Sequence, residues 1–151
     1  MTIYSGLLLV HLLGAVVWIG GMVFALFCLR PAAIVVLPPQ QRIPLLHAAL
    51  GRFFTIVVLV IALMIASGVA MIVTVGVKQM PFAWQWMIGL GIVMMAVFFH
   101  LRAAPFARLE KSVQSQDWPS AGRYLDQIRV GVMLNLAIGL SIVAIMKLGR
   151  Y

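Results

Sequence analysis

Acidic residues are scarce in this chain of 151 residues, which has three Asp and Glu residues against eleven Lys and Arg residues. Charged residues make up 9% of the sequence, whereas a soluble domain has about 25%. So few charges cannot cover a soluble fold, which excludes a soluble enzyme, a disordered segment and a nucleic-acid-binding domain. The single cysteine, Cys28, excludes an internal disulfide.

Hydrophobic residues are abundant instead, at 64% of the chain, and they gather in four runs. A hydrocarbon core of about 30 Å needs about 20 apolar residues in a helix. The runs therefore predict an all-α integral membrane protein, a single four-transmembrane-helix bundle over residues 1–151. The expected helices cover about residues 4–29, 45–77, 81–102 and 123–148.

The basic residues predict the orientation of these helices. Eight of the eleven lie in or beside the first and third connections: Arg30, Arg42, Arg52, Arg102, Arg108, Lys111, Arg123 and Arg129. Only Lys78, Lys147 and Arg150 lie elsewhere. By the positive-inside rule, these two connections are cytoplasmic and both termini are periplasmic. We therefore expect a multi-pass protein of the bacterial inner membrane. Its net charge of +8 then reflects the orientation of the helices in the membrane.

Prolines and acids mark the two arginine-rich connections. Pro31 and the segment 38–41 are expected to end the first helix. In the third connection, Asp126 lies within helical reach of Arg123 and Arg129, and we interpret this group as a solvated helix face.

His11 is the most informative residue inside a span, because a polar group there is costly unless it has a partner or a function. It lies about 9 Å to the periplasmic side of the centre of its run. Met71 of the second helix and Met87 of the third are expected at a similar depth. Imidazole and thioether ligands suit Cu(I), and a His/Met pair can also hold haem iron. Methionine is, however, also an ordinary core residue.

Two further histidines are candidates of lower rank. His100 is expected at the cytoplasmic end of the third helix, about 22 Å in depth from His11, so these two cannot hold one metal or haem iron within one chain. His47 is interpreted as a solvated or headgroup-contacting residue.

In the fourth helix, Gly131, Asn135 and Gly139 recur every four residues. Such a stripe predicts close helix packing with one interhelical hydrogen bond. Ser67 and Ser141 are interpreted as helix residues that hydrogen-bond their own backbone. Because no acid lies in a span, we do not expect a conventional enzyme, and redox activity would require bound haem.

Several segments together resemble the copper resistance protein D (CopD) family, in the form of a small stand-alone four-helix member. These segments are residues 11–22, 29–31, 50–54, 99–101 with Pro105 and Arg108, 117–121, 128–129 and 135–140. The resemblance implies an inner-membrane protein linked to copper, with His11, Met71 and Met87 as candidate metal ligands.

A more distant resemblance is to HemJ, a four-helix membrane oxidase that carries haem b. It rests on His11 followed by Trp18 and a glycine, and on His100 near the end of the third helix. Residues 84–91 lack the lysine that HemJ proteins carry, so this resemblance implies haem b binding through His11 and His100 as candidates rather than the oxidase activity.

Three functions therefore remain open: copper binding or passage, a haem b redox protein, and a cofactor-free partner subunit. Beyond the lipid bilayer itself, a homo-oligomer is a possible partner.

Overall fold

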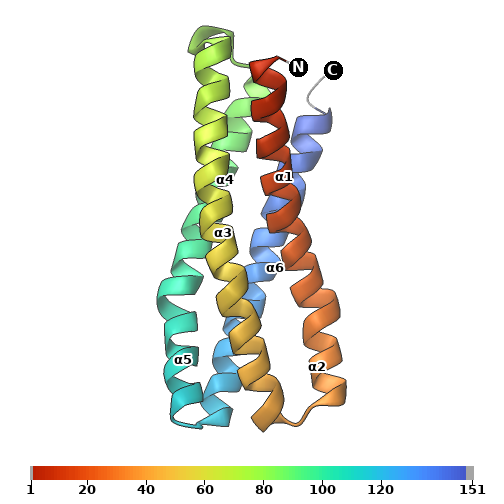
Figure 1. Ribbon diagram of the computed structural model, residues 1–151, viewed down its shortest axis with the longest axis vertical. Coiled ribbons are helices and arrows are strands. Elements are labelled where there is room, and N and C mark those ends of the chain that lie inside the picture. The colour runs from red at the N-terminus through yellow and green to blue at the C-terminus, as the bar shows by residue number, and fades with distance from the viewer. Residues whose placement is uncertain (1, 149–151) are drawn as a thin grey trace.

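Four long helices form the protein (Figure 1). The computed structural model describes residues 2–148. Its continuous helices are Ile3–Val36, Pro39–Val75, Phe82–Gln114 and Trp118–Leu148. Each is long and apolar enough to cross a membrane, which confirms the prediction of a four-helix, multi-pass membrane protein.

Two of the four helices contain a wide π-helical turn. These turns are labelled η1 and η3, and a short 3-10 turn between the second and third helices is labelled η2. The first helix consists of α1 (Ile3–Phe24), η1 (Ala25–Leu29) and α2 (Arg30–Val36). The second is α3 (Pro39–Val75), followed by the 3-10 turn η2 (Val77–Gln79). The third consists of α4 (Phe82–Leu101), η3 (Arg102–Phe106) and α5 (Ala107–Gln114), and the fourth is α6 (Trp118–Leu148).

The helices extend further at the arginine-rich end than the sequence indicated, and the expectation that Pro31 ends the first helix is wrong. Proline lacks an N–H group, and its ring presses on the carbonyl four residues earlier. In η1 the N–H of Arg30 instead donates to Ala25, five residues back, and this wider turn accommodates the proline. The η3 turn differs in that Pro105 lies inside it.

Asp117 determines where α6 begins. Its Oδ1 accepts a hydrogen bond from the Ser120 N–H at 3.1 Å, the usual arrangement of a helix N-cap, and Pro119 fits the first turn. The hydroxyl and N–H of Ser120, together with the charge of Arg123, hold the pKa of the Asp117 carboxyl below its usual value.

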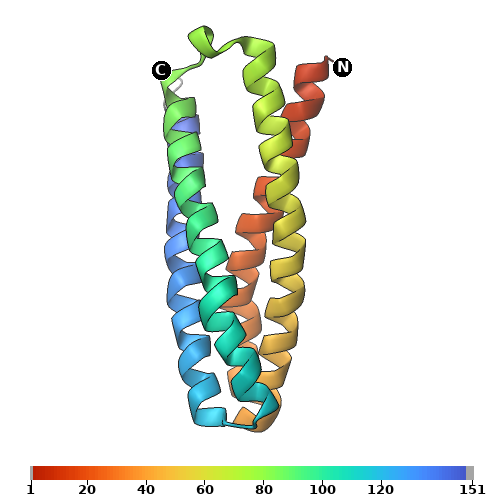
Figure 2. The same cartoon turned by 90° about the vertical axis from the view of Figure 1, so that its left-hand side faces the viewer.

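The bundle consists of two helix pairs. α1 packs along α3, and α4 packs along α6, which Figure 2 shows from the side. Both ends of the described chain lie at one end of the bundle, opposite α2 and α5 (Figure 1). The core contains edge-on aromatic contacts of Phe98 with Trp18 and with Phe54.

The outer faces of the helices are apolar as well. Large side chains such as Leu12, Leu13 and Val16 are each more than half exposed. An apolar exterior of this extent is what a bilayer covers.

The glycine stripe of α6 packs as predicted. A Cβ on Gly131 would lie 2.5 Å from Leu101 Cδ2, and one on Gly139 would lie 3.3 Å from Ile19 Cγ1. Asn135 between them is 2% exposed. The expected interhelical hydrogen bond is wrong, because within residues 2–148 the buried Asn135 Oδ1 has no partner.

Candidate functional site

His11 is half-buried on α1 and faces α3. Its Nδ1 lies 3.1 Å from the carbonyl oxygen of Met64 and 3.3 Å from Ser67 Oγ. The hydroxyl of Ser67 donates to the Leu63 carbonyl at 2.7 Å, so the lone pairs of Oγ remain for the histidine.

These partners determine which nitrogen of His11 carries the proton. A carbonyl oxygen can only accept, so Nδ1–H must donate to Met64. A neutral imidazole then has its lone pair on Nε2. Nε2 makes no hydrogen bond to the residues that the structure describes, and it is therefore the atom that could bind a metal.

Small residues allow α1 and α3 to come this close. A Cβ on Gly68 would lie 3.5 Å from His11 Cε1, in ordinary contact. A Cβ on Gly14 would lie 2.7 Å from Met64 Cγ and 3.2 Å from Met64 Sδ. The thioether of Met64 thus lies in the α1–α3 interface over Gly14, about one helical turn from His11.

The two methionines predicted as ligands lie in different helix pairs. Met71 is buried on α3, one turn from Ser67 toward the chain ends. Met87 is half-buried on α4, which packs along α6. Neither methionine side chain makes a described contact with His11. Residues 2–148 contain no group of three or more His, Cys, Asp or Glu side chains that could hold a metal.

His100 lies at the other end of the span from His11. Phe98, two residues before it, contacts Phe54 with ring centroids 5.5 Å apart, whereas His11 contacts Ser67 of the same helix α3. The stretch from Phe54 to Ser67 rises about 20 Å. His100 is exposed on α4, so one chain does not bring the two histidines to one ion.

His47 is not the solvated residue that its surroundings in the sequence indicated. It is half-buried, and its ring stacks on Phe106 with centroids 5.1 Å apart and planes 18° apart. Phe106 belongs to η3, and a continued helix there was not expected.

Sequence reasoning missed Met64 as a partner of His11, although it correctly interpreted Ser67 and Ser141 as bonded to their own helix backbone. It placed His11 level with Met71, about one turn too far toward the chain ends, because it aligned the two helices by the centres of their apolar runs, whereas α3 extends from Pro39 to Val75. Counting back one turn from Ser67, a polar residue of α3 one turn from Met71, would have found Met64.

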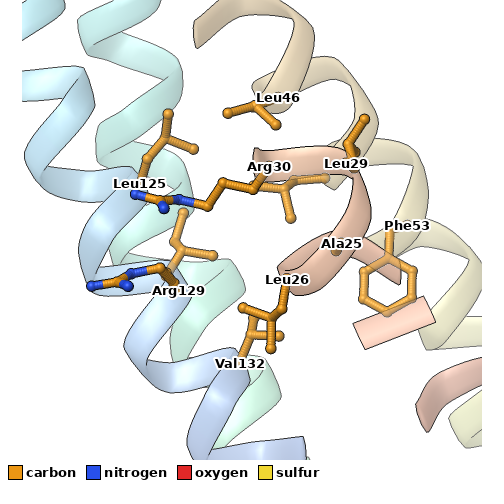
Figure 3. Close-up of a pocket in the computed structure, with 11 residues that line it drawn as sticks. Ala25, Leu26, Leu29, Arg30, Leu46, Phe53, Leu125, Arg129 and Val132 are labelled. Atoms are coloured by element: carbon orange, nitrogen blue, oxygen red, sulfur yellow. The ribbon is translucent and has the colours of Figure 1, made fainter. Parts of the chain in front are cut away.

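Two adjoining pockets lie toward the arginine-rich end, between the first helix, α3 and α6. One, the apolar pocket (Figure 3), has a volume of about 40 Å³ and is lined mainly by apolar side chains such as Leu26, Phe53 and Val132, with Arg129 at its edge. The second, the arginine pocket, has a volume of about 90 Å³ and is lined by Arg30, Arg42, Ile34, Ile43, Leu46, Gly122, Leu125 and Asp126.

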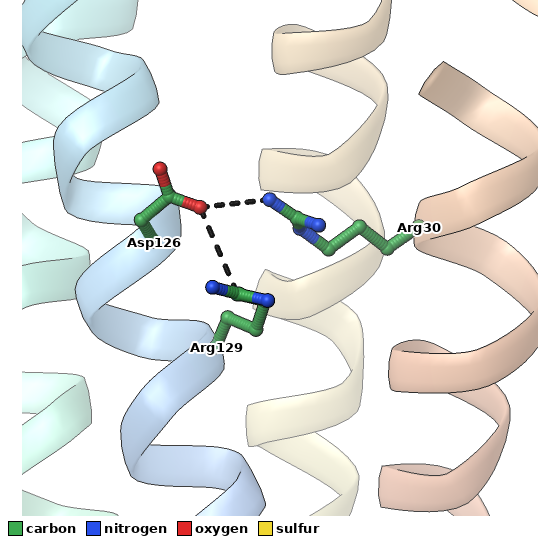
Figure 4. Close-up of polar contacts among 3 residues, drawn as sticks. All are labelled: Arg30, Asp126 and Arg129. Carbon is green, nitrogen blue, oxygen red and sulfur yellow. Dashed lines mark hydrogen bonds and ion pairs between the residues drawn. The ribbon is translucent and has the colours of Figure 1, made fainter. Parts of the chain in front are cut away.

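The ion pairs beside these pockets differ from the expected ones. Asp126 Oδ1 accepts from Arg30 Nη2 at 2.7 Å and lies 3.8 Å from Arg129 Nε (Figure 4). Arg123 donates instead to Ser120 Oγ at 2.9 Å. Of the two arginines within helical reach of Asp126, Arg129 lies beside it and Arg123 does not, and Arg30 of the first helix makes the shorter ion pair.

These features define a class: a multi-pass α-helical membrane protein with a hydrogen-bonded histidine inside its spans. A family model described as copper resistance protein D matches residues 47–148, and the chain belongs to this CopD family. The protein is thus a copper-related membrane protein. His11 precedes the matched segment. No curated protein and no solved structure matches the chain.

Proposed function

We propose that the protein binds Cu(I) inside the membrane and passes it on, with His11 as the central ligand. The observation that carries this proposal is the hydrogen bond from His11 Nδ1–H to the Met64 carbonyl oxygen. It holds the ring in one orientation and leaves Nε2 as a metal ligand, as the outer partners of metal-binding histidines do.

The neighbouring donors suit copper as cargo. Thioethers and imidazole are soft, neutral ligands that select Cu(I). Met64 lies nearest to His11, Met71 is buried about two turns further along α3, and Met87 would complete the set from α4. None of these ligands carries a negative charge that would neutralise Cu(I). The bound ion therefore remains a net positive charge in a medium of low dielectric, which weakens its binding. The site would therefore release copper readily, as passage requires.

The proposed location is the bacterial inner membrane, with both chain ends in the periplasm. The charge asymmetry supports this orientation, because the arginines of both pockets lie at the end opposite the chain ends. The His11 site then lies in the periplasmic half of the bilayer.

The test is Cu(I) binding to the detergent-purified protein, measured by competition with a chromogenic Cu(I) chelator. We expect His11→Ala to weaken binding at least tenfold, and Met64→Leu and Met71→Leu to weaken it less. His100→Ala is the matched control and should bind as the parent does. Unchanged binding in His11→Ala would refute the proposal.

The haem b alternative gives a different result in the same preparation. A protein purified with a Soret band that His11→Ala abolishes would assign His11 to haem instead. Loss of that band in His100→Ala would require a second subunit, because His11 and His100 lie about 20 Å apart along the span.

A further inference from the structure

We propose that the arginine pocket and the apolar pocket together bind one anionic glycerophospholipid. Its phosphate would lie among Arg30, Arg42 and Arg129, and an acyl chain would begin over the apolar pocket that Phe53 and Val132 help to line. This inference does not depend on the copper site, which lies in the other half of the bundle.

The first argument is depth. The first helix rises about 40 Å from Ile3 to Arg30, and α6 rises about 33 Å from Asp126 to Leu148. Both lengths exceed the roughly 30 Å thickness of a hydrocarbon core. When the chain ends of these helices lie at one edge of the core, Arg30 and Asp126 lie beyond the other edge, where lipid phosphates are found.

The second argument is charge. Arg30, Arg42 and Arg129 face a single carboxylate, that of Asp126, which leaves a local charge of 3 − 1 = +2. The Arg30 and Arg129 side chains are 28% and 41% exposed, so donors of both remain accessible. Arg42 makes no ion pair within residues 2–148. Guanidinium groups bind phosphate strongly, and basic pockets between membrane helices bind anionic headgroups.

The third argument is the apolar continuation. Arg30, Leu46 and Leu125 line both pockets. Figure 3 shows Arg30 reaching across toward Leu125 of α6, with Leu46 above it in the view and Leu26 and Val132 below it. A free phosphate would gain nothing from such a lining. A lipid would place its phosphate at the arginines, and the first carbons of an acyl chain would lie over the mouth of the apolar pocket, which at about 40 Å³ does not enclose a whole chain.

The experiment compares three probes on the full chain in detergent: phosphatidylglycerol, phosphatidylcholine of the same acyl chains, and inorganic phosphate. Native mass spectrometry gives the retained adducts, and thermal unfolding gives the stabilisation. We expect phosphatidylglycerol to be retained preferentially. Equal retention of both lipids, or equal stabilisation by inorganic phosphate, would overturn the proposal.

Two variants and one control locate the site. Arg42→Gln removes one charge and no ion pair, and should weaken phosphatidylglycerol binding about fivefold. Gly122→Leu adds bulk to the arginine pocket without a change of charge and should also weaken it, since a Cβ there meets nothing within 4 Å and the fold can accept it. Arg108→Gln, an exposed arginine of α5 outside both pockets, is the control. Equal loss in Arg42→Gln and Arg108→Gln would show a general surface effect and refute the site.

Discussion

Replacing Asn135 by valine is expected to stabilise the bundle, although it removes the one amide in the middle of α6. The Asn135 side chain is 2% exposed, and within the described residues its Oδ1 has no hydrogen-bond donor. A buried polar atom without a partner costs about 1–3 kcal/mol. Hydrogen bonds within membrane bundles average about 0.6 kcal/mol because the unfolded state also finds partners, so we expect a gain of about 1 kcal/mol.

The measurement is reversible unfolding in mixed detergent micelles, followed by circular dichroism as the denaturing detergent is increased. Asn135→Ala should be close to neutral, because it removes the same amide but leaves a small cavity. Ser141→Ala is the control on the same helix: this exposed serine donates only to the Ala137 carbonyl, at 2.9 Å, and its loss should change stability by less than about 0.5 kcal/mol.

The result that would refute this reasoning is a loss of more than about 1 kcal/mol in both Asn135 variants with Ser141→Ala unchanged. Asn135 would then donate or accept a stabilising hydrogen bond, as its sequence pattern indicated.

Three further outcomes are expected. Gly21→Ala should destabilise the bundle by about 1–3 kcal/mol in the same unfolding assay, because its Cβ would overlap the Phe53 ring. In the control Gly20→Ala, the new Cβ meets no atom within 4 Å, so the free energy of unfolding should rise by up to about 1 kcal/mol. Equal effects of the two variants would contradict the packing of α1 on α3. Asp117→Asn should be less stable than the parent at pH 7. Because the pKa of Asp117 is lowered in the folded protein, its carboxylate stabilises the fold above the unfolded pKa, and this stabilisation is lost as pH falls below about 4. The melting temperatures of the two proteins should therefore converge in acid. A difference in melting temperature that does not depend on pH would exclude this carboxylate as the cause. Asp126→Asn should cost at most about 1 kcal/mol, since both its ion pairs are partly exposed, and a larger loss in chemical unfolding would mean that the arginines depend on it for their positions.

The sequence by itself determined the number of spans and their helical nature. Apolar runs of about 20 residues leave a chain no other way to satisfy its backbone in lipid. It also singled out His11, because a polar side chain in such a run is conspicuous wherever its neighbours lie. The close packing at Gly131 and Gly139 followed from the same kind of local pattern.

The tertiary structure decided the partners. His11 reaches Met64 rather than the level of Met71, because the register of α1 on α3 depends on which side chains pack over Gly14 and Gly21. Asp126 pairs with Arg30, 96 residues earlier in the chain, a contact that the spacing of residues along α6 could not predict. Spacing along a helix predicts neighbours within that helix, whereas contacts between helices depend on how far each one extends and how closely the pair can approach.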